Sequence, residues 1–468
     1  MTDANAGEQS HDPAVPEALT AFMRTGWGER PLDVRPHPAA EIAAQRRAKL
    51  ASMFPGETLI VPAGGYKVRA NDTDYRFRSE TAHTWLSLNQ TSDAVLVVLP
   101  DGESVLYARP RSERTTDEFF RDRQYGELWV GRRPSLEEIS QSLGVATRDV
   151  RDLEADIARW PKPRLLAGVD RRVDASVDLD DTRNGELALA LSELRLVKDS
   201  WEIAELQRAC DITTLGFEDC VRDWENAQRY GERWIEGTFF RRARAMGNDI
   251  GYDSIVGGGS HATTLHWTDN TGQLRPGDLV LLDMGVEAES LYTADVTRTL
   301  PVSGRFTPLQ RDLYTLVLNA QQAGIDALAP GETFRAGHHA AVEVLAHGLK
   351  DLGLLPGTVE EALDKESRVY TRWTLHGVSH MLGMDVHDCA AASTSVYPEG
   401  DLAEGMCLTV EPGLYFQIDD ELAPEELRGI GIRIEDDVLI TADGAQNLSA
   451  ALPRDPDAIE EWMAQLGA

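Results

Sequence analysis

The sequence predicts a two-domain protein of mixed α/β class, in which an N-terminal α/β domain precedes a C-terminal domain of α+β type. Length is the first observation, because 468 residues exceed the roughly 100–200 residues of a typical single domain. Composition is the second, because 42% hydrophobic and 26% charged residues are ordinary for a globular chain. Alternation is the third, since short apolar strand patterns alternate with amphipathic helical patterns.

Charge and hydropathy exclude several classes of function. The formal net charge of −32 opposes attraction to phosphate backbones and anionic lipids, so we expect no nucleic acid and no membrane partner. No apolar run approaches the ~18–20 residues that span a bilayer, and the N-terminus lacks a signal-peptide pattern. The four cysteines form no CxxC pair, which is typical of reduced thiols in a hydrophobic core. We therefore expect a cytoplasmic protein.

The N-terminal half is predicted to contain an extension and one domain. Residues 1–40 are rich in Pro, Ala and acidic residues without periodicity, and we expect a partly ordered extension. Residues 41–195 form the predicted α/β domain. Its strands include TLIVPAG and the pair within AVLVVLPDGESVLYAR, with PDG as the turn. This domain has few convergent histidines or buried acids, so we expect it to shape or assemble the protein.

The C-terminal domain is predicted to span residues 196–468 and to open with a helix. Asp199 or Ser200 can cap its first free N–H groups. Apolar residues then recur at steps of three and four, at Ile203, Leu206, Cys210, Phe217 and Val221. Further on, short strands alternate with helices such as LQRDLYTLVLNAQQAGIDAL.

Four carboxylates lie on or beside apolar strands of this domain. In DLVLLDMG, period-two alternation leaves both strand faces apolar, so Asp283 should be buried. Glu411 ends the strand in MCLTVEPGLYF, Asp295 begins the strand in YTADVTRTLPV, and Glu435 shares a strand face with Arg433 in GIRIEDDVLI. A single strand-end aspartate would more often cap a turn. Four acids that converge in an apolar core need cations, because like charges raise one another's pKa.

A dinuclear metal site would supply those cations. The stretch HGVSHMLGMDVHD places His376, His380 and His387 close together, and His266 lies in TLHWTDN. A lone histidine is more often structural, whereas three within thirteen residues beside an acidic core favour a ligand. Oxygen donors with one imidazole suit two divalent ions, first Mn²⁺, with Co²⁺, Zn²⁺ or Fe²⁺ as alternatives.

The order LLDMG, ADVTRT, HGVSHMLGMDVHD, TVEPGLY and IRIEDD resembles the metal-binding signature of the pita-bread metallopeptidases, and specifically of aminopeptidase P and prolidase. The resemblance is detailed from about Lys198 to Ala445. It implies a pita-bread (creatinase/aminopeptidase-like) catalytic domain. The N-terminal domain resembles the family's creatinase-N-like α/β domain in length, in position and in RANDTDYRFRSETAHTWLSL.

This resemblance implies a role for each candidate residue. The metal ligands would be Asp283, Asp295, His380, Glu411 and Glu435, of which Asp295 and Glu435 bridge both ions. Arg433 and Tyr415 would keep Asp283 in place. A hydroxide between the metals would attack the scissile carbonyl, and Glu411 would transfer its proton. His387 would stabilise the tetrahedral intermediate, His266 would position the substrate, and His376 would line the pocket after the scissile bond.

The resemblance implies hydrolysis of the N-terminal Xaa-Pro bond of peptides with Pro at the second position, by a homodimer or homotetramer. A prolidase restricted to Xaa-Pro dipeptides is the first alternative, and an inactive pita-bread scaffold that binds peptides or proteins is another. Two departures stand out. Asp283 and Asp295 lie twelve residues apart, one more than is usual in the family, and we place the extra residue in the loop EAESLY. His261 replaces a different polar residue, and its role is left open.

Overall fold

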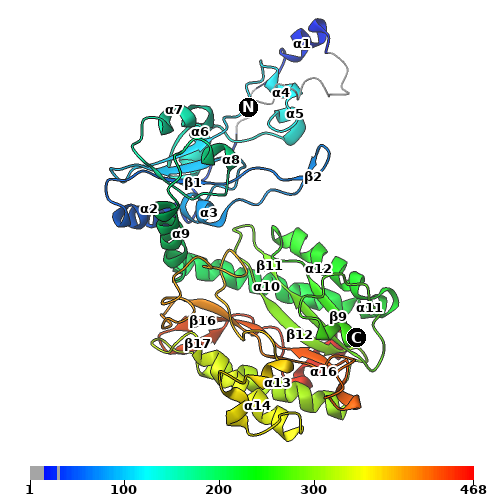
Figure 1. Ribbon diagram of the computed structural model, residues 1–468. Coiled ribbons are helices and arrows are strands. Elements are labelled where there is room, and N and C mark those ends of the chain that lie inside the picture. The colour runs from blue at the N-terminus through cyan, green and yellow to red at the C-terminus, as the bar shows by residue number, and fades with distance from the viewer. Residues whose placement is uncertain (1–14, 29–31) are drawn as a thin grey trace. The chain divides into compact units, whose positions relative to one another are not determined.

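The computed structural model describes residues 15–28 and 32–468, and its path is drawn in Figure 1. The chain divides into two compact units, residues 1–188 and 189–468. This division falls inside helix α9 (Asp181–Arg195), close to the predicted boundary at 195/196, which stays a prediction. The predicted extension over residues 1–40 lies partly outside the described residues and includes helix α1 (Glu17–Met23).

The first unit is built on a five-stranded mixed sheet in the order β6-β5-β4-β1-β7. The predicted strands are present, and β4 pairs antiparallel with both β1 and β5. Parallel pairs, β1 with β7 and β5 with β6, complete the sheet. The strands are β1 (Leu59–Pro62), β4 (Val95–Val98), β5 (Ser104–Ala108), β6 (Ala146–Asp149) and β7 (Arg164–Leu165), and a separate hairpin joins β2 (Val68–Ala70) to β3 (Thr73–Asp74).

Short helices surround this sheet, which gives the predicted α/β domain. They are α2 (Ala40–Met53), α3 (Thr81–Ser87), α4 (Glu118–Arg121), α5 (Glu127–Val130), α6 (Leu136–Leu143), α7 (Leu153–Ile157) and α8 (Arg171–Asp174), with a 3₁₀ turn η1 (Val150–Asp152). The core of the unit includes Ile60, Val95 and Val97 on the sheet, packed with Leu153 and Ile157 of α7. Strands β1 and β4 are buried at every position, and α3 contacts both of them, so both faces of the middle of the sheet are covered.

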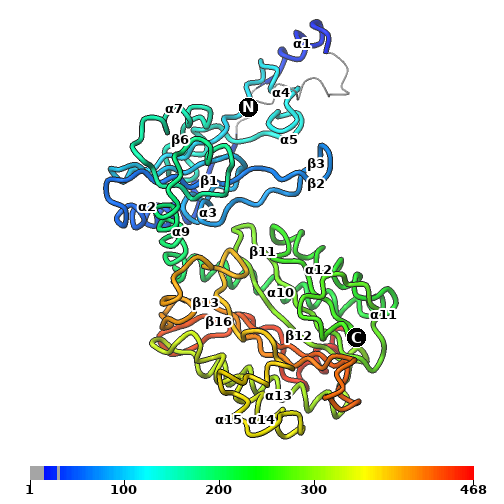
Figure 2. The backbone as a smooth tube through the Cα atoms, viewed as in Figure 1, coloured from blue at the N-terminus to red at the C-terminus, as the bar shows by residue number. Residues whose placement is uncertain are grey.

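The second unit contains two three-stranded and two two-stranded sheets, in the orders β12-β10-β9, β13-β16-β17, β11-β8 and β14-β15. All of their pairs are antiparallel. The strands are β8 (Asp249–Ile250), β9 (Ile255–Gly258), β10 (Leu279–Met284), β11 (Val286–Glu287), β12 (Val296–Pro301), β13 (Cys407–Val410), β14 (Gly413–Tyr415), β15 (Gly431–Arg433), β16 (Asp436–Thr441) and β17 (Gly444–Asn447). Strands distant in the sequence, such as β12 and β16, run close together in Figure 2.

Helices pack on these sheets, as the second unit of Figure 1 shows, with α10 and α12 on one side and α13 and α14 on the other. The helices are α10 (Ser200–Arg222), α11 (Trp224–Tyr230), α12 (Glu232–Met246), α13 (Pro308–Asp326), α14 (Ala336–Asp351), α15 (Val359–Leu363) and α16 (Pro456–Leu466), with 3₁₀ turns η2 (Gly259–Thr263), η3 (Val369–Arg372) and η4 (Glu425–Leu427). The predicted start of α10 is confirmed, because the Asp199 carboxylate accepts the N–H groups of Trp201 and Glu202.

One predicted strand is interrupted. The stretch GIRIEDDVLI was expected to place Arg433 and Glu435 on one strand face, but β15 ends at Arg433 and β16 begins at Asp436. The two halves pair with different strands, β15 with β14 and β16 with β13. The facing chain breaks at the same level, between Val410 and Gly413. Glu411 and Glu435 therefore lie where both paired chains leave the strand conformation, a position we call the matched gap. Their side chains need not alternate between the two faces of a sheet there.

The remaining global expectations concern cysteines and membranes. Cys210, Cys220, Cys389 and Cys407 are all free and buried, as expected for core thiols. None of the helices in the described part of the chain combines the length and apolar character that a bilayer crossing requires.

Candidate active site

Asp283 enters the site from the central strand β10, whose residues are all buried between β9 and β12. Its side chain is itself buried, as predicted. One carboxylate oxygen, Oδ2, accepts a hydrogen bond of 2.6 Å from Nη2 of Arg433. The other, Oδ1, lies 2.7 Å from the hydroxyl oxygen of Tyr252. The buried charge of Asp283 is thus matched by one guanidinium.

Asp295 precedes β12 and faces His380. Its Oδ2 lies 3.2 Å from His380 Nε2. Its Oδ1 lies 2.5 Å from the same Tyr252 hydroxyl oxygen that contacts Asp283, and the one proton of that hydroxyl is donated to one of the two carboxylates at a time. Its backbone N–H donates to the carboxylate of Asp437 at 3.1 Å. The chain therefore fixes Asp295 from both sides and leaves its carboxylate beside that of Asp283.

Glu411 and Glu435 complete the group of acids from the matched gap between the strands. Glu411 lies between two histidines, with Oε1 3.5 Å from His380 Nε2 and Oε2 3.5 Å from His376 Nδ1. Glu435 accepts a hydrogen bond of 2.6 Å from the Thr297 hydroxyl, and its backbone N–H donates to the Thr297 carbonyl at 3.1 Å. All five predicted metal ligands converge here.

The donor set fits divalent cations. Ligand atoms of Asp295, His380 and Glu435 all lie within 4.8 Å of one another, and carboxylate oxygens with one imidazole are suitable ligands for such ions. Burial raises the pKa of Asp283 despite the Arg433 charge. Burial and the neighbouring acids raise the pKa of Glu411 to about 7 and that of Glu435 well above its usual value. Protein cations alone do not balance these acids.

His380 carries part of that missing positive charge when it is protonated. Burial opposes its protonation, but the hydrogen bond to Asp295 and the charge of Glu411 prevail and raise the pKa of His380 to about 9. Burial acts against ionisation of Asp295 as well, and the contact with His380 reverses it, so the pKa of Asp295 is lowered. A metal ligand must be neutral imidazole, so a cation bound here would displace this proton.

A hydrogen-bonded chain connects Asp283 to His376. Arg433 donates from Nη1 to the Tyr415 hydroxyl at 2.9 Å, and that hydroxyl lies 2.7 Å from His376 Nε2. The expectation that Arg433 contacts Asp283 agrees with this geometry, whereas Tyr415 reaches Asp283 only through Arg433. Tyr252, which the sequence analysis did not single out, contacts Asp283 directly.

The acids line one cavity of about 560 Å³, which we call the acid-lined cavity. Its wall consists of Tyr252, Asp253, Ile255, Leu265, His266, Thr268, Asp283, Asp295, His376, Gly377, Ser379, His380, Val386, His387, Glu411, Arg433 and Glu435. The His387 ring lies 4.3 Å from that of His380, and burial and the His380 charge lower the pKa of His387. All four predicted catalytic residues, Glu411, His387, His266 and His376, therefore face one cavity.

A buried glutamate organises the segment that carries His266. Glu232 at the start of α12 is fully buried and accepts hydrogen bonds from the backbone N–H groups of Gly258 and Gly272 and from Trp267 Nε1, at 2.8, 2.6 and 2.9 Å. His261 Nδ1 lies 2.8 Å from the same carboxylate. His261, whose role the sequence left open, thus belongs to the support of the loop and not to the cavity wall.

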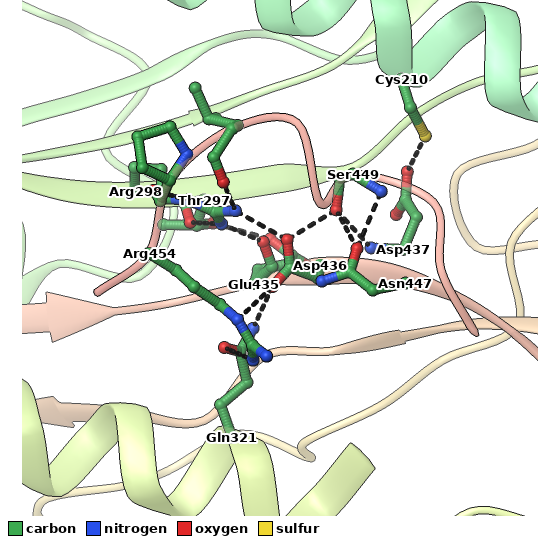
Figure 3. A network of polar contacts seen from close by, with 12 residues as sticks. Cys210, Thr297, Arg298, Gln321, Glu435, Asp436, Asp437, Asn447, Ser449 and Arg454 are labelled. Atoms are coloured by element: carbon green, nitrogen blue, oxygen red, sulfur yellow. Dashed lines mark hydrogen bonds and ion pairs between the residues drawn. The ribbon is translucent and has the colours of Figure 1, made fainter. Parts of the chain in front are cut away.

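Behind Glu435 lies a second polar network, shown in Figure 3. Arg298, fully buried, donates to the Asp436 carboxylate at 2.7 Å and to the Glu435 carbonyl at 2.6 Å. The Ser449 hydroxyl and the Gln321 amide also donate to Asp436, at 2.6 and 2.9 Å. This network immobilises the backbone beside Glu435 and supplies its own counter-charge.

Comparisons with known proteins agree with this geometry. The profile of metallopeptidase family M24 matches residues 204–442, and that of the aminopeptidase P N-terminal domain matches residues 43–164. The chain is 52% identical to Xaa-Pro aminopeptidase 1 of Streptomyces coelicolor over 97% of this chain and 93% of that relative. It is similar to the structure of E. coli aminopeptidase P with the inhibitor Pro-Leu, with a TM-score of 0.81 and 30% identity over 92% of this chain and 99% of that one. A zinc-substituted E. coli aminopeptidase P in complex with product gives a TM-score of 0.81 and 31% identity, over 92% and 100% of the two chains.

Proposed function

Because this chain belongs to the aminopeptidase P group of metallopeptidase family M24, we propose that its acid-lined cavity is a dinuclear metal centre. The chain is a metallo-aminopeptidase that hydrolyses the Xaa-Pro bond at the N-terminus of peptides. The proposed ligands are Asp283, Asp295, His380, Glu411 and Glu435. The observation that supports the proposal best is the convergence of four acids, three buried and Glu411 half-buried, with insufficient positive charge from the protein.

The metal is proposed to be Mn²⁺, because a site of oxygen donors with one imidazole and no thiolate does not select soft metals. Co²⁺, Zn²⁺ and Fe²⁺ are the alternatives, and the zinc-substituted E. coli relative is one case in which zinc occupies the site of a similar protein. When bound, the ions would polarise the scissile carbonyl and lower the pKa of a water molecule between them.

Glu411 is proposed as the group that takes a proton from that water and returns it to the leaving amine. Its two oxygens face different histidines, His380 and His376, so the carboxylate is oriented along the cavity wall. His376 is in turn bonded to the Tyr415 hydroxyl, which limits rotation of the imidazole. Arg433 and Tyr252 keep Asp283 in its orientation from opposite oxygens.

His387 is proposed to stabilise the oxyanion, because its ring projects into the cavity beside His380. Donors aimed at the charge that develops in a transition state are effective where water is excluded. His266 is proposed to position the peptide, since it lines the same cavity and lies on the segment that Glu232 organises. His376 is proposed to line the pocket that follows the scissile bond.

Two peptides test the activity directly after chelator treatment and addition of Mn²⁺. One is an Xaa-Pro dipeptide and the other an Xaa-Pro-Yaa-Yaa tetrapeptide. Release of the first residue from the tetrapeptide is the expected result. Cleavage of the dipeptide alone would indicate the dipeptidase alternative, which the relatives do not favour, and metal-dependent cleavage of neither would contradict the function. We also propose a homodimer or homotetramer, which light scattering of the purified protein tests; the cytoplasmic location stays a prediction.

A further inference from the structure

A second, smaller cavity of about 150 Å³ adjoins the acid-lined cavity. The two share His376, Gly377 and Ser379 as a common wall. The lining of the second cavity is Phe334, Arg335, His338, Arg368, Tyr370, Thr371, Thr374, Leu375, His376, Gly377, Val378 and Ser379. We call it the cationic cavity. It exceeds by far the ~10–15 Å³ that one water molecule needs, so a small organic group can enter it.

The two cavities differ in the charged groups that line them. Five carboxylates line the acid-lined cavity, at Asp253, Asp283, Asp295, Glu411 and Glu435. Among the described residues that line the cationic cavity there is no carboxylate, and its charged groups are the guanidinium groups of Arg335 and Arg368. A ligand that enters the second cavity is therefore selected for negative charge.

Arg368 is the cation best placed to meet such a ligand. It lies in the left-handed region, with φ of 47°, at the start of η3. No carboxylate of the described residues lies within ion-pair distance of its guanidinium. Arg335 differs, because its Nη2 lies 2.6 Å from Glu399 Oε1, so its charge is already partly matched. Arg368 thus keeps its full charge at the mouth of the cavity.

His338 supplies a neutral donor on the same wall. Its Nδ1 accepts the Val378 N–H at 3.4 Å, so the ring proton resides on Nε2. Burial first, and then the positive charges of His339, Arg335 and Arg368, lower the pKa of His338 to about 4. This shift agrees with a positive potential in the cavity. The histidine can donate a hydrogen bond without adding a third charge.

The wall also contains apolar side chains. Phe334 and Tyr370 are 6% exposed, and Val378 is fully buried, whereas Leu375 is 70% exposed. The exposed leucine, next to these buried side chains, offers surface for an apolar group of a ligand. The cavity therefore combines several apolar side chains with one unmatched guanidinium.

We propose that the cationic cavity binds the C-terminal carboxylate and terminal side chain of a short peptide whose N-terminal residue occupies the acid-lined cavity. A short peptide ends in a carboxylate, and the cationic cavity, which His376 separates from the acid-lined cavity, is lined by guanidinium groups and no carboxylate among its described residues. This inference rests on the proposed function, and it adds a preference for short peptides with a free C-terminus.

The test compares each Xaa-Pro-Yaa and Xaa-Pro-Yaa-Yaa peptide as the free acid and as the C-terminal amide. The wild type is expected to favour the acid in kcat/KM by about five- to tenfold at one of these lengths, since a hydrogen bond to a charged group has roughly that effect at a partly solvated site. Arg368→Gln should reduce this acid-to-amide ratio to about one, and Arg368→Lys should restore part of it. Arg305→Gln, which removes an exposed arginine elsewhere in the same unit, is the control and should keep the wild-type ratio.

The outcomes separate the cavity from the activity. If wild type and Arg368→Gln have the same acid-to-amide ratio of kcat/KM at both peptide lengths, and both cleave the amides normally, the carboxylate subsite is overturned. The proposed Xaa-Pro activity would stand in that case. Absence of cleavage of every peptide would instead contradict the proposed function. Acetate added to the amide peptides tests a separate source of the anion. If acetate alters amide cleavage in wild type but not in Arg368→Gln, while the acid-to-amide ratio is one, the cavity binds a free anion and the peptide terminus is excluded.

Discussion

Glu435 and Asp436 are neighbours in the chain and are equally buried, with exposures of 1% and 0%, yet they belong to two regions with opposite charge balance. Asp436 receives Arg298, Ser449 and Gln321 as donors, as drawn in Figure 3. Glu435 receives one hydroxyl, from Thr297, and otherwise faces three more carboxylates. Burial and those acids raise the pKa of Glu435 well above its usual value.

The surroundings of the two residues distinguish an acid with a functional role from one with a structural role. A buried charge that its own chain neutralises stabilises the fold around it, and breaking the pair is costly. A buried group of acids that the chain leaves unbalanced is a site for an external cation. The matched gap separates the two residues. Glu435 lies in the gap and lines the acid-lined cavity, whereas Asp436 is the first residue of β16.

The largest expected effect is on catalysis, in the unbalanced region. Glu411→Gln should lower kcat by about 10²–10⁴-fold at saturating Mn²⁺, because a positioned proton acceptor contributes on that order. Steady-state hydrolysis of the tetrapeptide measures it. Stability of the chelator-treated variant should be no lower than that of the wild type, since an uncompensated acid has been removed. A kcat within threefold of wild type would show that Glu411 transfers no proton.

The balanced region should respond in stability. Arg298→Met removes the closer of the two arginines beside Asp436, since Arg454 Nε lies 3.9 Å from that carboxylate and Arg298 lies 2.7 Å from it, so the free energy of unfolding should fall by about 3–5 kcal/mol. Urea denaturation of the chelator-treated protein measures this change. Glu435→Gln is the matched control on the adjacent residue and should unfold at the same or higher urea concentration than the wild type. Equal losses in both variants would remove the distinction between the two regions.

The stability of the protein should also depend on pH through Asp388, which follows His387. Like Asp436, this buried acid is paired with cations of the protein itself. Burial acts to raise its pKa, but the charges of Lys198 and Arg195, whose nitrogens lie 3.0 and 3.2 Å from it, lower the pKa of Asp388 to about 2. The folded pKa lies below the unfolded value of about 3.9. Its stabilisation is therefore complete above that pH and is lost as the pH falls toward 2.

Asp388→Asn should consequently lower the free energy of unfolding by about 2 kcal/mol at pH 7, with a smaller difference from wild type at pH 3. Urea denaturation at the two pH values measures it. A difference that is the same at both values would mean that the ionised carboxylate is not the source of the stabilisation.

The smallest expected effect concerns Tyr252, whose hydroxyl contacts Asp283 and Asp295. Tyr252 stays protonated, because burial and the charges of Asp283 and Asp295 raise its pKa well above the usual value. Tyr252→Phe should weaken Mn²⁺ binding by about tenfold, as is typical when a group that orients metal ligands is lost. Calorimetric titration measures the affinity. Unchanged affinity would assign Tyr252 to packing alone.

Much of the site could be predicted from local pattern. Period-two alternation in DLVLLDMG predicted a buried Asp283, and the capping pattern at Asp199 predicted the start of α10; both agree with the structure. The twelve-residue step to Asp295 is spanned by the turn at residues 289–290 and the short strand β11, which precedes it. Where the extra residue was inserted relative to the family stays a prediction.

Tertiary partners could not be read from the sequence. Tyr252 lies in a short irregular segment between β8 and β9, where no periodicity indicates which way its hydroxyl points. The gap at Glu435 was missed because GIRIEDDVLI looks like one continuous apolar strand, and only the change of partner from β14 to β13 divides it. The role of Glu232 could not be predicted from the sequence either, since its four hydrogen-bond partners come from segments that only the fold brings together.

Calorimetric titration of Mn²⁺ into chelator-treated wild type and Glu435→Gln measures directly whether the unbalanced acids bind metal ions. Two ions per chain should bind to the wild type, and Glu435→Gln should lose at least one of them, while its fold persists by circular dichroism. Absence of Mn²⁺ binding to the folded wild type, or binding that Glu435→Gln leaves unchanged, would contradict the assignment of the unbalanced acids to a dinuclear metal centre.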